Sequence, residues 1–137
     1  MTQEEKELLL KVLCAILPYK LHCRVFRLNG DIKENDDILY GVIGDNVVTL
    51  KSDKDECLMY YQIKPYLRSM SSMTKEEKAI YSNYKIVVRG LGIVFEYNLD
   101  FVTEWLLKHH FDYRGLIEKG LAIEAPEGMY NTKTEQL

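Results

Sequence analysis

The period of the apolar residues changes near Pro18, and this change constrains the fold more than any other feature of the sequence. Before it, apolar residues recur at the spacing of one helical face, and Thr2 with Glu5 has the spacing of a capping box. Pro18 ends the pattern because the residue before a proline is pushed out of the helical region. Beyond Lys20 the apolar residues alternate as they do in strands. The sequence therefore predicts a helix over about residues 3–16, followed by a β unit.

The β unit is predicted to contain four short strands joined by tight turns. The strands are expected at residues 22–28, 38–43, 47–50 and 57–63, and the Gly- and Asn-containing turns between them are hairpin signals. Four short strands bury little surface as a flat sheet. We therefore expect a small antiparallel, barrel-like sheet that the N-terminal helix closes on one side.

A linker over residues 69–74 is expected to lead into a helical C-terminal half. Thr74 and Glu77 repeat the capping-box spacing, which predicts a helix from Lys75 to about Tyr84. The elements expected after it are two strands of a short hairpin at 85–88 and 92–97, a helix capped by Asn98 or Asp100, a helical turn over 113–119 that ends at Gly120, an extended piece over 121–124 and a tail over 126–137.

These elements predict an α+β fold that forms one cooperative domain. Residues 1–68 hold the helix and the β unit, and residues 75–125 form a helix-hairpin-helix half packed against it. One continuous core is expected, formed by Leu9, Val12, Leu13, Ile16, Val25, Val42, Val48, Trp105 and Leu106.

Composition and charge exclude several classes of protein. Hydrophobic residues make up 47% of the 137 residues and charged residues 28%, as in globular proteins. No apolar run approaches the ~20 residues of a membrane span. The acidic start is not typical of a secretory signal. Three cysteines without CxxC spacing predict reduced thiols in a cytoplasmic protein.

The charge is distributed unevenly along the chain. Its net value is −3, which argues against strong non-specific binding to nucleic acid. Residues 1–30 carry five cations and three acids, whereas residues 31–56 carry three cations and eight acids. We attribute this acidic excess to exposed turns of the β unit.

Two stretches of the sequence resemble a known family. One is KPYLRSMSSMT over residues 64–74, and the other is HHFDYRGLIEKGLAIEAP over residues 109–126, continued by EGMY. They are similar to the blocks of a large family of small phage and prophage proteins of gut bacteria, a family without an assigned activity. The resemblance implies a phage or mobile-element accessory protein that acts in the cytoplasm of a bacterial host. It carries no catalytic residue to this chain.

The two blocks supply the candidate binding residues. They mix cations, tyrosines and an acid, and such residues are common on surfaces that bind proteins. The candidates are Lys64, Tyr66, Arg68, His110, Asp112, Tyr113 and Arg114. The same residues can instead form a structural latch between the two halves. Either role requires the two blocks to touch in the folded protein.

The sequence gives little support for catalysis. His109 and His110 are adjacent, so on a helix their side chains diverge by about 100° and do not easily share one metal ion. No nucleophile elbow or phosphate-binding loop is present. We therefore predict no catalytic residue, no bound metal and no cofactor.

Three functions remain in order of preference. The first is a non-enzymatic accessory protein that binds another protein of the host or the phage. The second is a nucleic-acid or nucleotide binder that uses the cations of the β unit, which are Lys20, Arg24, Arg27, Lys64 and Arg68. The third is a small hydrolase that uses His109, His110 and Asp112. The sequence predicts no oligomeric state and no membrane partner.

Overall fold

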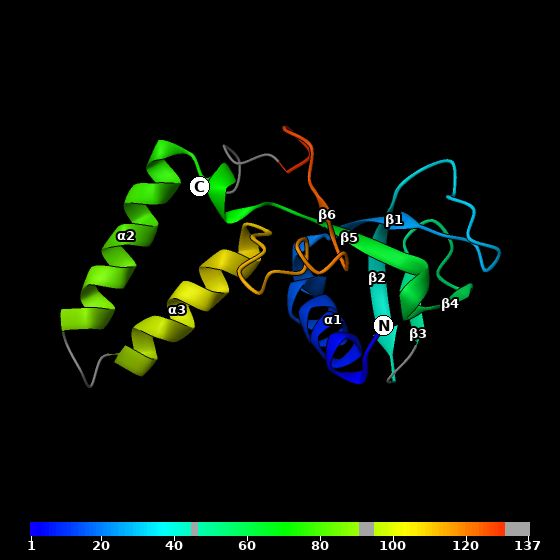
Figure 1. The fold of residues 1–137 in the computed structure, drawn as a ribbon, viewed down its shortest axis with the longest axis horizontal. Helices are drawn as coiled ribbons and strands as arrows, with labels where there is room; N and C mark the ends of the chain where they lie inside the picture. Colours follow the sequence, from blue (N-terminus) through cyan, green and yellow to red (C-terminus); the bar gives the residue numbers. More distant parts are fainter. Residues whose placement is uncertain (45–46, 91–94, 131–137) are drawn as a thin grey trace.

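A helix-covered sheet forms one end of the molecule, and a pair of helices forms the other (Figure 1). The computed structural model describes residues 1–44, 47–90 and 95–130, with their side chains outside residues 84–100. The α+β class predicted from the sequence is confirmed.

The first helix, α1, spans Gln3–Ile16 and begins at the predicted capping box. The Thr2 hydroxyl accepts a hydrogen bond from the Glu5 N–H at 3.1 Å, and the Glu5 carboxylate accepts one from the Thr2 N–H at 3.1 Å. The buried face of α1 carries Leu9, Val12, Leu13 and Ile16. A single 3-10 turn, η1 (Leu17–Tyr19), then redirects the chain, and Lys20 adopts a left-handed conformation with φ of 56°.

Six strands form one open, mixed sheet in the order β4-β3-β2-β1-β5-β6. The strands are β1 (His22–Val25), β2 (Asp37–Ile43), β3 (Val47–Leu50), β4 (Cys57–Met59), β5 (Ile63–Leu67) and β6 (Ile123–Glu124). The neighbours from β4 to β5 in this order are antiparallel, whereas β5 and β6 are parallel. A 3-10 turn, η2 (Tyr60–Gln62), joins β4 to β5. The first three predicted strand regions are present. The strand predicted over 57–63 is wrong in its second half, because η2 follows β4 and the chain then forms β5, a strand that was not predicted. The sheet does not close into a barrel.

The register between β1 and β5 assigns their side chains to two faces. Cys23 lies opposite Pro65, and Val25 lies opposite Ile63; all four are buried, on the side that α1 covers. Arg24 lies opposite Lys64, so both side chains point to the other side, because successive residues of a strand alternate between faces. We call this second side, which faces away from α1, the outer sheet face.

The helical half differs from the prediction in its middle. A 3-10 turn, η3 (Met70–Ser72), leads into α2 (Lys75–Gly90), and α3 spans Phe95–Lys108. The predicted strand over 85–88 is wrong, because these residues continue α2. A short apolar, β-branched run does not by its period distinguish a strand from a helix, and no proline ends the helix here. Of the second predicted strand, residues 92–94 lie outside the described residues, and residues 95–97 belong to α3.

The segment after α3 is built from turns. The helical turn predicted over 113–119 is present as a single hydrogen-bonded turn and not as a regular helix. The Lys119 N–H donates to the Gly115 carbonyl at 3.3 Å, and the Leu121 N–H donates to the Leu116 carbonyl at 3.0 Å. Gly120 has the predicted positive φ, at 74°, which suits glycine because it lacks a Cβ atom. The chain then forms β6 at the edge of the sheet.

The described residues form two apolar clusters rather than the single predicted core. The larger one joins α1 to the sheet and to Leu116, Leu121 and Ala122. The smaller one contains Met73, Val102, Leu106 and Phe111, with Trp105 half-buried at its edge. Leu106 and Trp105 therefore pack with the segment before α2 rather than with α1. The two helices have a small core of their own at their base.

No helix among the residues that the structure describes is long and apolar enough to cross a membrane.

We expect Leu13→Ala to lower the free energy of unfolding by ~2–5 kcal/mol, because the side chain is fully buried between α1 and the sheet. Urea denaturation followed by circular dichroism measures this change. Cys14→Ala, one position away on the exposed side of α1, is the control and should change stability by less than ~0.5 kcal/mol. Equal effects of the two substitutions would contradict the packing of α1.

Candidate functional site

The two sequence blocks that carry the candidate residues meet in the structure. The Arg68 N–H donates to the His110 carbonyl at 2.7 Å, and the Asp112 N–H donates to the Arg68 carbonyl at 2.8 Å. Farther along, the Ala125 N–H donates to the Leu67 carbonyl at 2.7 Å, beside the parallel β5–β6 pair. The predicted contact between the blocks is therefore confirmed. Backbone hydrogen bonds form it, and it positions the side chains considered next.

Arg68 is buried at the centre of this contact. Its Nη1 and Nη2 atoms donate to Oε2 and Oε1 of Glu77, each at 2.7 Å, and Nη2 also lies 3.3 Å from the Ser72 carbonyl. The guanidinium lies 4.2 Å from the centre of the Phe111 ring. Only 8% of Arg68 is exposed. Its donors are therefore used inside the protein, which is the latch role rather than the binding role.

Glu77 connects this latch to α2. It is 1% exposed, and its carboxylate also accepts the Thr74 N–H at 2.9 Å, which completes the predicted capping box. Burial by itself would raise the pKa of Glu77, but the hydrogen bonds from Arg68 and Thr74 outweigh it, and the pKa is lowered. The sequence indicated the cap. It gave no signal that Arg68 would bind the same carboxylate.

His109 lies beside the latch. Its Nδ1 is 3.7 Å from Oε2 of Glu77, and its ring centre is 4.8 Å from that of Trp105. Burial lowers the pKa of His109, while the charge of Glu77 opposes the shift.

His110 points away from His109 and is buried at a different contact. Its Nε2 donates to the Tyr19 carbonyl at 2.6 Å, so the neutral ring carries its proton there. Its ring stacks on Tyr130 with 3.7 Å between centres and 7° between planes. Nδ1 is buried without a hydrogen-bond partner in the described structure. Burial lowers the pKa of His110 from 6.5 to about 4. A histidine held neutral in this way does not exchange protons with a substrate near neutral pH.

Tyr130 completes the sheet at the end of β1. Its hydroxyl accepts the His22 N–H at 3.0 Å and donates to the Tyr66 carbonyl at 2.8 Å. In the register of β1 and β5, these two backbone groups would face each other directly. The hydroxyl therefore bridges a gap in the strand ladder. The sequence analysis places Tyr130 in a tail and gave no signal of this role.

Tyr66 and Lys64 lie on the outer sheet face. The Tyr66 hydroxyl accepts from Nε of Arg24 at 3.2 Å and donates to the Asp36 carboxylate at 3.1 Å, and burial raises the pKa of Tyr66. The Arg24 guanidinium lies 5.7 Å from the centre of the Tyr66 ring. The Lys64 ammonium lies 5.8 Å from the centre of the Phe26 ring. This face thus presents two cations, each over an aromatic ring.

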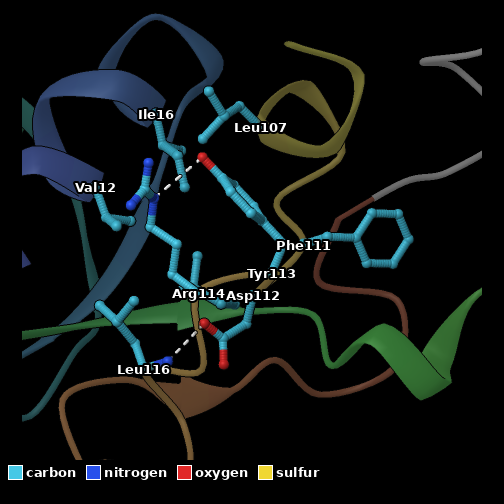
Figure 2. A pocket seen from close by; sticks show the side chains of 9 residues that line it. Val12, Ile16, Leu107, Phe111, Asp112, Tyr113, Arg114 and Leu116 are labelled. Atoms are coloured by element: carbon cyan, nitrogen blue, oxygen red, sulfur yellow. Dashed lines mark hydrogen bonds between the residues drawn. The ribbon is translucent and has the colours of Figure 1, made fainter. Parts of the chain in front are cut away.

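Asp112, Tyr113 and Arg114 occupy the turn after α3. The Asp112 carboxylate accepts the Leu116 N–H at 2.7 Å (Figure 2). It also accepts the Ile117 N–H at 2.9 Å, so it stabilises the turn. Arg114 is exposed, and its Nε donates to the Tyr113 hydroxyl at 3.2 Å (Figure 2). Arg114 and Asp112, both described, therefore have different partners and do not pair with each other.

A shallow hollow lies beneath Arg114 and Tyr113 (Figure 2). It measures about 160 Å³ when the space open to solvent is counted, and it has no internal room for a water molecule. Apolar side chains of α1 and α3 line it, among them Val12, Ile16 and Leu107. It is too small for a nucleotide or for a hydrolase substrate.

The structure gives no support for a shared metal or catalytic centre. His109 and His110 contact different groups, and Asp112 is used in a turn. The described part of the chain contains no group of three or more His, Cys, Asp or Glu residues that could hold a metal ion. The three cysteines are free thiols, and burial raises the pKa of Cys23 to about 12.

The candidate residues therefore separate into three groups. Arg68, His110 and Asp112 hold the junction together, Tyr113 and Arg114 lie at the surface over α1 and α3, and Lys64 and Tyr66 belong to the outer sheet face. Sequence reasoning had not placed Phe26 and Asp36 beside Lys64 and Tyr66.

Comparisons with models of protein families, with curated proteins and with solved structures found no match for this chain.

We expect Glu77→Gln to lower the free energy of unfolding by ~3–5 kcal/mol, because it leaves the Arg68 charge buried without a counter-charge. Chemical denaturation at pH 7 measures the loss. Glu76→Gln, the neighbouring exposed acid, is the matched control and should cost less than ~0.5 kcal/mol. A near-neutral Glu77→Gln would show that the pair contributes little to stability.

We expect stability to fall as the pH is lowered from 6.5 to about 4. Over this range the unfolded chain binds a proton at His110 while the folded protein does not, so the loss from this residue approaches ~3 kcal/mol. His110→Phe keeps an aromatic ring against Tyr130 and should make the pH dependence shallower over the same range. Melting temperatures of both proteins from pH 7 to pH 4 measure this. Parallel pH profiles would contradict the assignment.

Proposed function

We propose that the chain is a non-enzymatic accessory protein, encoded by a phage or mobile element, that binds another protein in the cytoplasm of its bacterial host. The outer sheet face is the proposed contact surface. The observation that supports it most directly is the Arg24–Lys64 pair, in which two cations lie opposite each other across β1 and β5. The resemblance of the two sequence blocks to phage proteins supports the biological setting.

Like charges directly opposite on neighbouring strands destabilise a sheet. An anionic group of a partner placed between Arg24 and Lys64 would offset this repulsion. The adjoining strand β2 carries Ile38 opposite His22. Tyr40, at a β-bulge of this strand, is 53% exposed, and the Lys54 ammonium lies 4.5 Å from its ring centre. Tyrosine and arginine are enriched at the centres of protein interfaces. The face therefore suits an acidic protein segment that also carries an apolar or aromatic side chain.

A protein partner fits this face better than a nucleic acid does. Arg68, one of the cations in the nucleic-acid hypothesis, is used in the buried pair with Glu77. Asp36 accepts a hydrogen bond from Tyr66 on the same face, so this face also carries a negative charge. A polyanion such as a nucleic acid would meet these negative charges along its length, whereas a short acidic segment would not.

We expect Lys64→Glu to abolish capture of a protein partner from extracts of the phage-bearing host, because it reverses the charge of the proposed face. The measurement is affinity isolation with the tagged full chain, followed by mass spectrometry. Lys11→Glu on the exposed side of α1 makes the same charge change away from this face and should retain the partner. Circular dichroism checks that both variants are folded.

Two outcomes would contradict the proposal. One is a partner captured equally by the wild type and by Lys64→Glu. The other is salt-sensitive retention of the wild type on single-stranded DNA or RNA that Lys64→Glu loses, which would favour the nucleic-acid function instead.

A further inference from the structure

The side chain of Tyr130 is bound by three residues from separate parts of the chain. Its ring stacks on His110 with 3.7 Å between ring centres, and it packs edge-to-face with the His22 ring at 5.2 Å. Its hydroxyl accepts the His22 N–H at 3.0 Å and donates to the Tyr66 carbonyl at 2.8 Å. The ring and both hydrogen-bonding functions of the hydroxyl are therefore recognised. We call these three residues, His22, Tyr66 and His110, the tyrosine site.

His110 occupies a backbone position at which glycine is usual. Its N–H donates to the Leu107 carbonyl at 3.0 Å, and the Phe111 N–H donates to the Leu106 carbonyl at 2.9 Å, which is the pattern that ends a helix on a left-handed residue. His110 has φ of 63°, and its buried Nδ1 has no hydrogen-bond partner in the described structure. Both features cost stability, and strain of this kind is typical of functional sites. The ring that His110 presents to Tyr130 offsets this cost.

Tyr130 anchors the last described segment of the chain. Residues 126–129 are exposed or half-buried, and within the described segment 126–130 only Tyr130 is buried. Neither of the two apolar clusters of described residues includes Tyr130. The hydrogen bond from the Met129 N–H to the Pro126 carbonyl closes a turn inside the segment. We call residues 126–130 the flap, and its departure from the tyrosine site would open neither cluster.

The two strands can also accommodate the loss of Tyr130. The Phe26 N–H donates to the Gln62 carbonyl at 2.6 Å, at the end of the β1–β5 pair. Hydrogen-bonded pairs recur at every second residue of an antiparallel ladder, so in this register His22 and Tyr66 form such a pair. The Tyr130 hydroxyl lies between their backbone groups. Without it these groups are placed to bond to each other, so they have partners whether the flap is bound or released.

The flap resembles the ligand expected at the outer sheet face. Residues 124–130, EAPEGMY, contain two acids, no cation and a tyrosine at their end. The outer sheet face suits an acidic segment with an aromatic side chain, and the tyrosine site adjoins it, because Arg24 and Lys64 form the next hydrogen-bonded pair of the same ladder. We propose that the tyrosine site binds a tyrosine in the acidic segment of the partner, which displaces the flap. This inference rests on the proposed function.

Peptide binding to the full chain tests the proposal. The probe is a peptide of residues 124–130, and isothermal titration calorimetry measures its affinity. Tyr130→Ala should bind the peptide at least ~10-fold more tightly than the wild type does, because the tethered flap competes at an effective concentration of about millimolar. Tyr61→Ala removes an exposed tyrosine elsewhere and should bind the peptide as the wild type does.

A second peptide tests recognition of the hydroxyl. The same peptide with Tyr130→Phe should bind the Tyr130→Ala protein several-fold less tightly, because it cannot bridge the His22 N–H and the Tyr66 carbonyl. Circular dichroism checks that each protein variant is folded. If Tyr130→Ala is unfolded, Tyr130→Phe in the full chain replaces it. That variant keeps the ring but loses both hydrogen bonds of the hydroxyl, so it should bind the original peptide several-fold more tightly than the wild type does.

Three results would overturn the inference. The first is a peptide that binds the folded Tyr130 variant no more tightly than the wild type. The second is equal binding of the two peptides, which would assign the contact to the acids alone. The third is a wild-type dimer in sedimentation equilibrium that Tyr130→Ala dissociates, which would assign the site to the flap of a second copy. Failure of the proposed function is distinguishable, because the peptides would then bind as expected while host extracts yield no partner whose capture depends on Lys64.

Discussion

The buried pair of Arg68 and Glu77 is the interaction on which the arrangement of the two halves depends. Arg68 follows the last residue of β5, and Glu77 caps the first turn of α2, so one ion pair fixes the end of β5 to the start of α2. The guanidinium also covers Phe111, which ties in the segment after α3. A buried ion pair adds little net stability, but it allows few geometries because every donor needs its acceptor. Its main effect here is to set the direction in which α2 leaves the sheet.

The contacts of Arg68 give the residues of the two sequence blocks a mainly structural role. Residues that look like a cluster of binding groups are largely consumed by the folded protein, since Arg68, His110 and Asp112 each satisfy backbone or buried partners. Two of the candidate cations, Lys64 and Arg114, are not used in the junction and lie beside it. A chain built in this way can vary its exposed residues beside the junction without losing the connection between its halves.

The sequence predicted the parts of the fold that local chemistry determines. The capping boxes at Thr2 and Thr74 and the turns of the β unit are local signals, and they predicted the starts of α1 and α2 and the regions of β1 to β4. The start of α3 and the strand β5 were not predicted, because Asn98 and Asp100 lie within α3 and Pro65 lies within β5. The strand over 85–88 failed because the apolar run there fits either secondary structure, and the choice depends on packing. Long-range contacts left no local trace, so the Arg68–Glu77 pair and the Tyr130 bridge appear only in the three-dimensional structure.

The Tyr130 bridge also affects the order in which the chain can fold during its synthesis. Its hydroxyl reaches the backbone of His22 across 108 positions of sequence, whereas the meander from β1 to β4 joins strands that are neighbours in the chain. Contacts between sequence neighbours form early, and those that close long loops form late. During synthesis, α1 and the meander can therefore assemble while the ribosome still holds the C-terminal segment. The gap between β1 and β5 stays unbridged until Tyr130 emerges. A chain that ended before β6 would also leave β5 as an open edge that can pair with other strands.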